Sequence, residues 1–293
     1  MSLYELLDVQ YDTAASGEAG SSGHAQRRLD LFVPPVEAPP LLVFVHGGAW
    51  RSGDKSEHTA LARSLALQHS TAVAVVNYRL TERNPPPGEM VEVRHPMHAL
   101  DVLLAIEFLY DWAGEGEGKP ELQKSFDREK LYFIGHSCGA HILTTLFLYP
   151  PALSLPPTPS HILRSTHALL LAEGIYSLPL LLETFPSYIE FIAPPFGGSS
   201  SGSSSPGSKY DIFSANHYDL RPGGEHMHWW VVHSEGDELV DFEQPEVMFD
   251  SLEILLEGEE GEVHQDWDTL KGDHYKTLDE PRFSEIVGEM LAV

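Results

Sequence analysis

A serine, an aspartate and a histidine stand in this 293-residue chain where together they could perform nucleophilic catalysis. The serine is Ser137, in the sequence LYFIGHSCGAHIL, where a short apolar run meets Gly-His-Ser-Cys-Gly and a helical pattern follows. Strand, tight turn and helix in this order predict a nucleophile elbow, which exposes the serine at the carboxyl edge of a sheet, near helix N–H groups. Gly135 and Gly139 flank the turn where a Cβ would collide with the neighbouring strand or helix.

The same G-x-S-x-G pattern occurs a second time, at residues 198–202, around Ser200. This copy lies in a Ser/Gly-rich tract, with no strand pattern before it and no helical pattern after it. Such a composition is typical of a flexible linker. Only Ser137 therefore has the sequence context that the chemistry requires.

A serine hydroxyl needs a base to remove its proton, and the base needs a third group that fixes its tautomer. In folds with such an elbow the order along the chain is Ser, then Asp or Glu, then His, each on a loop after a strand. Asp237 follows the predicted strand 228–233, and His274 follows the predicted strand 263–270. We therefore expect Asp237 to orient His274, and His274 to act as the base for Ser137.

Other acidic and histidine residues compete for these roles. Asp241 is better suited to open the next helix as its N-cap. His233 and His264 lie at the end of a strand and within one, where packing or hydrogen bonding accounts for them. Glu238 and Asp273 are less well placed, and His136, beside the serine, is expected to pack.

The oxyanion formed on attack needs N–H donors that already point toward it. One is the backbone N–H of Cys138, the residue after the serine. The others are expected from Gly48 and Ala49, in the loop His46, Gly47, Gly48, Ala49, Trp50 that follows the apolar run 41–45. Cys138 would thus matter through its backbone, and a catalytic thiol is the weaker alternative.

Composition narrows the class of protein. The formal charge of −26 disfavours nucleic acids and anionic membranes as partners. The single cysteine excludes an intramolecular disulfide, and no apolar run approaches membrane-spanning length. His95 and His98 have a plausible ligand spacing but lack a carboxylate or thiol set, so we expect neither a metal nor a cofactor. We expect a cytoplasmic protein, and the sequence leaves a homodimer open.

Strand-like and helical patterns alternate along the chain, which predicts an α/β fold with a mostly parallel sheet and helices on both faces. We interpret residues 1–293 as one domain, with about 175–225 as a cap-like insertion that contains the Ser/Gly-rich loop. Residues 26–33 are expected as an edge strand, after a mostly polar N-terminal stretch with a turn or loose arm at 16–23. The other expected strands are 41–45, 71–78, 131–134, 168–172, 228–233 and 263–270, and the expected helices include 56–68, 94–112, 244–256 and 284–291.

Four motifs together make the chain resemble the kynurenine formamidase (arylformamidase) family of the α/β-hydrolase superfamily. They are HGG-x-W at His46, GHSCGAH around Ser137, HSEGDELV around Asp237 and GDHY around His274. The resemblance spans about residues 41–275. Glu173 departs from the family, where many relatives carry a smaller or shorter residue before the glycine.

The resemblance implies hydrolysis of N-formyl-L-kynurenine, an aromatic formamide, to L-kynurenine and formate in tryptophan degradation. It implies the α/β-hydrolase fold, Ser137 as nucleophile and no cofactor. Trp50, Tyr176 and Tyr188 could hold the aryl ring, with core packing as the competing explanation for each. The alternatives are a carboxylesterase for short-acyl or aryl esters with the same groups, and a catalytically silent binding protein on a hydrolase fold.

Overall fold

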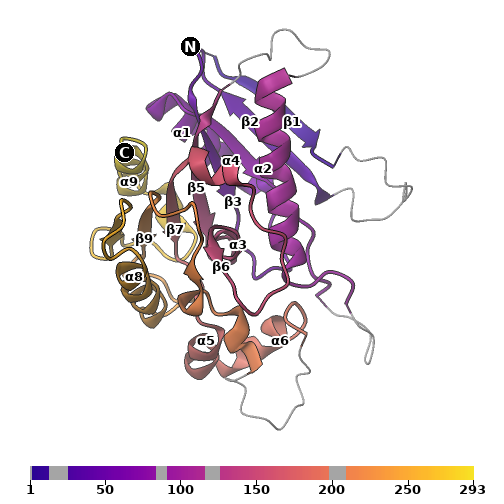
Figure 1. Ribbon diagram of the computed structural model, residues 1–293, viewed down its shortest axis with the longest axis vertical. Coiled ribbons are helices and arrows are strands. Elements are labelled where there is room, and N and C mark those ends of the chain that lie inside the picture. The colour runs from indigo at the N-terminus through magenta and orange to yellow at the C-terminus, as the bar shows by residue number, and fades with distance from the viewer. Residues whose placement is uncertain (1, 13–25, 84–90, 116–125, 198–208) are drawn as a thin grey trace.

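The protein is described by a computed structural model, shown in Figure 1, for residues 2–12, 26–83, 91–115, 126–197 and 209–293. Two predicted features lie outside these residues: the turn or arm at 16–23, and the Ser/Gly tract from residue 198 on, with the second G-x-S-x-G pattern.

A twisted central sheet organises the part of the chain that the structure describes. Its strands follow the order β1-β2-β4-β3-β5-β7-β9-β10. All neighbours from β4 to β10 run parallel, and β2 is antiparallel to both β1 and β4. The bounds are β1 Tyr4–Gln10, β2 Arg28–Val33, β3 Pro40–Val45, β4 Ala72–Val76, β5 Asp127–His136, β7 Thr166–Ala172, β9 His228–Val232 and β10 Val263–Asp266.

Helices cover both faces of this sheet, as the alternating sequence pattern predicts (Figure 1). α1 and α9 pack on one face, and α2, α3 and α8 pack on the other. The bounds of the helices are α1 Thr59–His69, α2 Met97–Glu115, α3 Cys138–Phe147, α4 Ser160–Ser165, α5 Leu178–Thr184, α6 Ile189–Ile192, α8 Glu243–Leu255 and α9 Pro281–Met290. The mostly parallel sheet and its helices confirm the predicted fold class.

The continuous apolar runs become central strands because they are buried on both sides. In β3, Leu42 and Phe44 join the core under α1 and α9, whereas Val43 and Val45 join the core under α2 and α3. Hydrophobic side chains therefore pack on both faces of β3, the strand that precedes the loop containing Gly48.

The prediction of the sheet edge was wrong. Residues 28–33 form β2, which lies inside the sheet, and the N-terminal stretch supplies the edge strand β1. An edge strand buries little, so its sequence carries a weak signal: Tyr4 and Leu7 are exposed. The short helix α4, directly before β7, was also not predicted.

Between β7 and β9 the chain passes over the carboxyl edge of the sheet as short elements, which Figure 1 shows around α5 and α6. These include the 3-10 turns Pro186–Tyr188, Asp211–Phe213 and Ala215–His217, and strand β8 Asp219–Leu220, which pairs with β6 Leu148–Tyr149. Buried Gln244 of α8 ties the start of this excursion down: its Oε1 accepts the N–H groups of Tyr176 and Ser177, each at 2.8 Å.

A membrane-spanning helix is not found in the described ranges, since none of their helices combines the length and the apolarity required.

Candidate active site

Ser137 stands at the turn between β5 and α3 with φ 56° and ψ −122°, a conformation that residues other than glycine rarely adopt. The turn is tight because its glycines leave no room. A Cβ on Gly135 would lie 2.6 Å from the backbone nitrogen of Ala140, and one on Gly139 would overlap the carbonyl oxygen of Val45. The predicted reason for both glycines is thereby confirmed.

We expect Gly139→Ala to lower the free energy of unfolding by about 1–3 kcal/mol, because the added methyl group must push α3 away from β3. Urea unfolding of wild type and variant measures this change. Gly288→Ala is the matched control, since its added Cβ would meet only the ring of His69, at 2.9 Å. Equal stability of Gly139→Ala and wild type would contradict this account of the turn.

Asp237 and His274 are brought together by the loops that follow β9 and β10. Nδ1 of His274 donates to Oδ2 of Asp237 at 2.7 Å, and both side chains are almost completely buried. Oδ1 of Asp237 accepts the N–H groups of Leu239 and Val240, at 2.8 and 3.0 Å. The carboxylate is thus held at both oxygens, and Nε2 of His274 is left free to accept a proton.

Ser137 and His274 line one pocket of about 300 Å³ but make no hydrogen bond with each other. Such loose serine–histidine geometry is common without a substrate. His136 contacts the loop that contains His274, because its Nε2 lies 2.7 Å from the carbonyl oxygen of His274. His136, expected only to pack, therefore also makes a hydrogen bond.

The loop after β3 packs directly on the elbow. A Cβ on Gly47 would lie 3.0 Å from Cβ of Ser137, so only glycine allows this approach. Gly48 and Ala49 line the pocket beside Ser137, both with positive φ (113° and 52°). Among the described residues neither N–H group donates to a backbone carbonyl, but the N–H of Ala49 interacts with the thiol of Cys138 and acts to lower its pKa.

The side chain of Cys138 is buried and contacts the loop after β3. Sγ of Cys138 accepts the N–H of Trp50 at 3.3 Å and lies 3.6 Å from the hydroxyl of Tyr78. Burial raises the pKa of the thiol to about 11, so it stays protonated at neutral pH. The ring of His46 stacks on Tyr78, whose hydroxyl donates to the carbonyl of His46 at 2.9 Å.

The three aromatic residues that were predicted as candidates to hold the aryl ring take different positions in the structure. Tyr188 lines the pocket, and its hydroxyl donates to the carbonyl of Leu239 at 3.2 Å. Trp50 and Tyr176 are fully buried and do not line it. The positions of Trp50 and Tyr176 thus favour core packing.

The sequence reasoning gave no site role to several residues that line the pocket, among them Arg51, Arg83, Phe191 and Tyr275. The guanidinium of Arg51 lies 5.2 Å from the ring centre of Phe191, and Nε of Arg83 donates to the carbonyl of Arg51 at 3.3 Å. Neither arginine forms an ion pair with a carboxylate within the described ranges. Partial burial, then the charge of Arg83, lowers the pKa of Arg51. The sequence signal was proximity: Arg51 directly follows the HGG-x-W motif, and Tyr275 is the last residue of the GDHY motif.

Glu173 is the most important residue that the sequence reasoning left without a role. It is completely buried at the end of β7, and its Oε1 accepts the N–H of Ser234 at 2.9 Å. Its other oxygen lies 3.2 Å from Nδ1 of His233, and the ligand atoms of Glu173, His233 and Asp237 all lie within 4.8 Å of one another.

Two buried carboxyl groups this close do not both ionise. Burial, together with the negative Asp237, raises the pKa of Glu173 to about 10. Burial acts in the same direction on Asp237, but hydrogen bonds from His274 and Glu173 outweigh it and lower the pKa of Asp237. Glu173 is therefore neutral, and the neighbouring Asp237 is ionised.

This pair predicts a pH-dependent stability. From about pH 5 to 9 the unfolded chain has released the Glu173 proton and the folded chain retains it, so rising pH favours unfolding by up to about 1.4 kcal/mol per pH unit. Glu173→Gln removes this contribution and keeps a neutral hydrogen-bonding group. Urea unfolding across this pH range should show wild type losing stability relative to the variant, and parallel profiles would contradict the neutral Glu173.

The structure also gives contacts for the histidine and aspartate residues that competed for the catalytic roles and for a metal site. Nε2 of His233 lies 3.2 Å from the carbonyl of Val240, and the ring of His264 stacks on Trp230 at 4.1 Å. Asp241 does not occupy the N-cap position of α8, which falls on Phe242, although its Oδ1 accepts the N–H of Glu243 at 3.1 Å. His95 and His98 are buried, with Nε2 of His98 3.0 Å from the hydroxyl of Thr81.

The fold and this carboxyl-edge site define the chain as an α/β hydrolase. The family model BD-FAE matches residues 29–148. Esterase B from Lactobacillus rhamnosis, with a bound tributyrin phosphonate, matches with a TM-score of 0.68 at 17% identity, over 99% of this chain and 84% of the esterase.

Sequence relatives narrow the family. The chain is 30% identical to the kynurenine formamidase-like hydrolase fscH of Fusarium equiseti, over 74% of this chain and 72% of that protein. It is also 30% identical to the kynurenine formamidase of Eremothecium gossypii, over 72% of this chain and 78% of that protein. The chain belongs to the kynurenine formamidase family.

Proposed function

We propose that the chain hydrolyses N-formyl-L-kynurenine to L-kynurenine and formate, with Ser137 as nucleophile, His274 as base and Asp237 as its orienting carboxylate. The observation that carries the proposal is the 2.7 Å Asp237–His274 hydrogen bond beside a pocket that Ser137 lines. The names of the two relatives supply the substrate.

The reaction follows from these groups. Oγ of Ser137 attacks the formyl carbon and its proton passes to Nε2 of His274, while the new oxyanion is held by the N–H groups of Gly48, Ala49 and Cys138. The C–N bond then breaks, and His274 returns the proton to the departing arylamine nitrogen. Water attacks the formyl-serine, loses its proton to His274, and formate leaves as Ser137 regains a proton.

The pocket suits an aromatic amino acid with a small acyl group. Tyr188 and Phe191 offer ring faces to the aryl group. Arg51 and Arg83 offer two cations to the substrate carboxylate, and guanidinium groups bind carboxylates with two parallel hydrogen bonds.

We expect Arg51→Gln to raise KM for N-formyl-L-kynurenine about tenfold, because one charge-assisted hydrogen bond is lost. Turnover of formanilide, which has the formamide but no carboxylate, should change little. Arg63→Gln is the control, since Arg63 pairs with Glu5 on the surface at 2.8 Å. An equal loss with both substrates would show that Arg51 does not read the carboxylate.

A carboxylesterase for short-acyl or aryl esters is the second candidate. The same three groups cleave esters, and Ile175, Leu239 and Val240 give the pocket an apolar wall that an acyl chain could contact. A silent binding protein is the third, and covalent labelling of Ser137 by an organophosphate, lost in Ser137→Ala, would exclude it.

One comparison separates the two enzymatic candidates. Formate release from N-formyl-L-kynurenine is measured beside turnover of phenyl acetate and phenyl butyrate, under the same conditions. The proposal predicts the higher kcat/KM for the formamide. Esters cleaved far faster than the formamide would make the chain a carboxylesterase.

We also propose that residues 1–293 form one domain with a cap at about 175–225, and that the protein is cytoplasmic. A homodimer is left open.

A further inference from the structure

A second group of potential ligands lies at the opposite edge of the sheet from Ser137. His228 is the first residue of β9, and Glu262 and His264 lie just before and within β10. β9 and β10 are parallel, with His264 opposite Trp230. Because side chains two residues apart on a strand point to the same face, His228, Glu262 and His264 share the face on which α9 packs.

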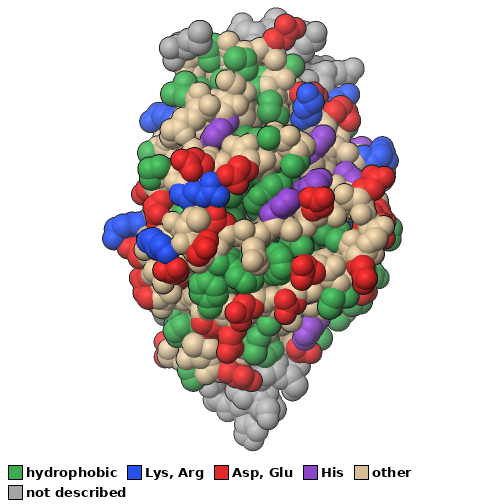
Figure 2. All heavy atoms as spheres, turned by 90° about the vertical axis from the view of Figure 1, so that its left-hand side faces the viewer, with side chains coloured by type: hydrophobic (Ala, Val, Ile, Leu, Met, Phe, Trp, Pro, Cys, Tyr) green, Lys and Arg blue, Asp and Glu red, His purple; other side chains and the backbone are tan. Residues whose placement is uncertain are grey.

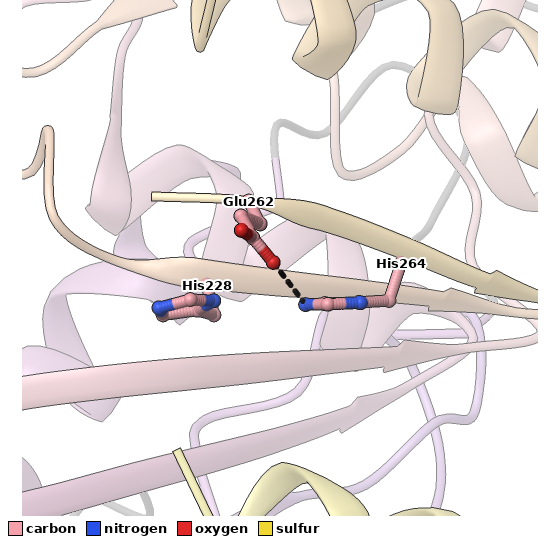
Figure 3. Close-up of side chains that lie close together, drawn as sticks. All are labelled: His228, Glu262 and His264. Atoms are coloured by element: carbon pink, nitrogen blue, oxygen red, sulfur yellow. Dashed lines mark ion pairs between the residues drawn. The ribbon is translucent and has the colours of Figure 1, made fainter. Parts of the chain in front are cut away.

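The three side chains converge. Figure 3 shows the two imidazoles facing each other across a gap, with the Glu262 carboxyl group over it. One ligand atom from each residue lies within 4.8 Å of the others, and Nε2 of His264 is 3.7 Å from Oε2 of Glu262. The rings of His228 and His264 are nearly parallel, with centres 5.9 Å apart.

The imidazole nitrogens that face this gap are unused. Nδ1 of His228 and Nε2 of His264 are hidden from solvent and form no hydrogen bond with any of the described residues. Hidden polar atoms without partners are uncommon, because each loses its hydration without replacement. A bound cation would supply the missing partner for both nitrogens.

Charge around the group favours a cation. Figure 2 shows acidic side chains spread over this side of the molecule, with most of the visible histidines in its upper half. The loop before β10, LEGEEGE, adds Glu257, Glu259 and Glu260 to Glu262.

We propose that His228, His264 and Glu262 form a binding site for a divalent transition-metal ion, with Zn²⁺ as the natural ligand. Two imidazoles and one carboxylate are a donor set that zinc takes, with water in the fourth position. Tetrahedral zinc would place the ligand atoms roughly 3.4 Å apart. Glu262, whose side chain is 69% exposed, has room to move inward.

This site is separate from the hydrolase chemistry. His228 and Glu262 stand where β9 and β10 begin, whereas Asp237 and His274 follow the ends of the same strands. The ion would instead join two neighbouring strands at the sheet edge. We therefore expect it to raise thermal stability by binding only the folded chain, without taking part in formate release.

Calorimetric titration of chelator-treated protein with Zn²⁺ tests the proposal. Wild type should bind one ion at this site, and His228→Gln/His264→Gln should weaken binding by far more than tenfold, since losing even an outer-shell partner costs about 10- to 100-fold. Glu262→Gln should weaken it by at least about tenfold. The control is His217→Gln, because His217 pairs with Asp211 at 3.2 Å and no third ligand joins this pair among the described residues.

Co²⁺ in place of Zn²⁺ gives a second readout. Wild type should show the visible absorption bands of tetrahedral cobalt, and the double variant should lack them while keeping its Tm in chelator. Equal zinc affinity in wild type and double variant, or octahedral cobalt spectra in both, would overturn the proposal. Zinc that binds only at Glu173, His233 and Asp237, which would show as inhibition of formate release unchanged in the double variant, would overturn it too.

Discussion

Replacing Ser137 with alanine will lower kcat for N-formyl-L-kynurenine by about 10⁴- to 10⁶-fold, the loss expected when the nucleophile of a serine hydrolase is removed. The variant has no oxygen to attack the formyl carbon, and the oxyanion donors alone supply the residual rate. KM should change little, because the hydroxyl contributes little to ground-state binding. Steady-state formate release with purified wild type and variant measures both constants.

The second G-x-S-x-G pattern provides the control. Ser200→Ala removes the serine of that pattern, and its formate release should equal that of wild type. Loss of activity in Ser200→Ala, together with retained activity in Ser137→Ala, would reverse the assignment of the nucleophile. Thermal unfolding of both variants excludes a loss of fold as the cause.

Asp237→Asn should lower kcat by about 10⁴-fold although it changes hardly any volume. The N–H groups of Leu239 and Val240 already donate to Oδ1, so the amide oxygen of asparagine would take that place. The amide NH₂ would then face Nδ1 of His274, where Oδ2 accepts a hydrogen bond in wild type. Nδ1 would become the acceptor, and Nε2 would carry the proton and fail as a base.

Glu238→Gln is the matched control for this variant, because Glu238 is the neighbouring exposed carboxylate on the same loop. It should keep wild-type kcat. Structures of both variants would show whether the His274 ring keeps its orientation. A wild-type kcat in Asp237→Asn would mean that Asp237 does not set the tautomer of His274.

The fold could be predicted from sequence because its signals are local. Apolar runs such as 41–45 indicate strands covered on both faces, and the glycines around Ser137 indicate a turn with no room for a Cβ. The order of the loops then indicated Asp237 and His274, which the structure joins by a hydrogen bond. Edge strand β1 was missed because it buries too little to leave such a pattern.

The pocket could not be predicted in the same way. Arg51, Arg83 and Tyr275 come from separate loops, and only their meeting in space makes them pocket residues. Trp50 and Tyr176 lie near the motifs in sequence, yet their side chains turn into the core. Glu173 was noticed only as a departure from the family. Its importance depends on how close β7 brings it to Asp237, a contact between residues far apart in the chain.

The closeness of Glu173 to Asp237 is compatible with catalysis because Glu173 is neutral. A neutral carboxyl group can donate a hydrogen bond to Asp237 without adding a second negative charge. Glu173 lies close to Asp237, and its Oε1 accepts the N–H of Ser234 on the same loop. The pH dependence of stability, rather than the rate, is the property that reveals this arrangement.

The central claim is that formate release from N-formyl-L-kynurenine passes through Ser137. The most direct measurement titrates the protein with an aryl phosphonate and follows residual formate release against the fraction of Ser137 that carries the adduct, mapped by peptide mass spectrometry. We predict a straight line that reaches zero activity when every Ser137 is labelled. Formate release that persists at full labelling, or that disappears while Ser137 is unmodified, would contradict the claim.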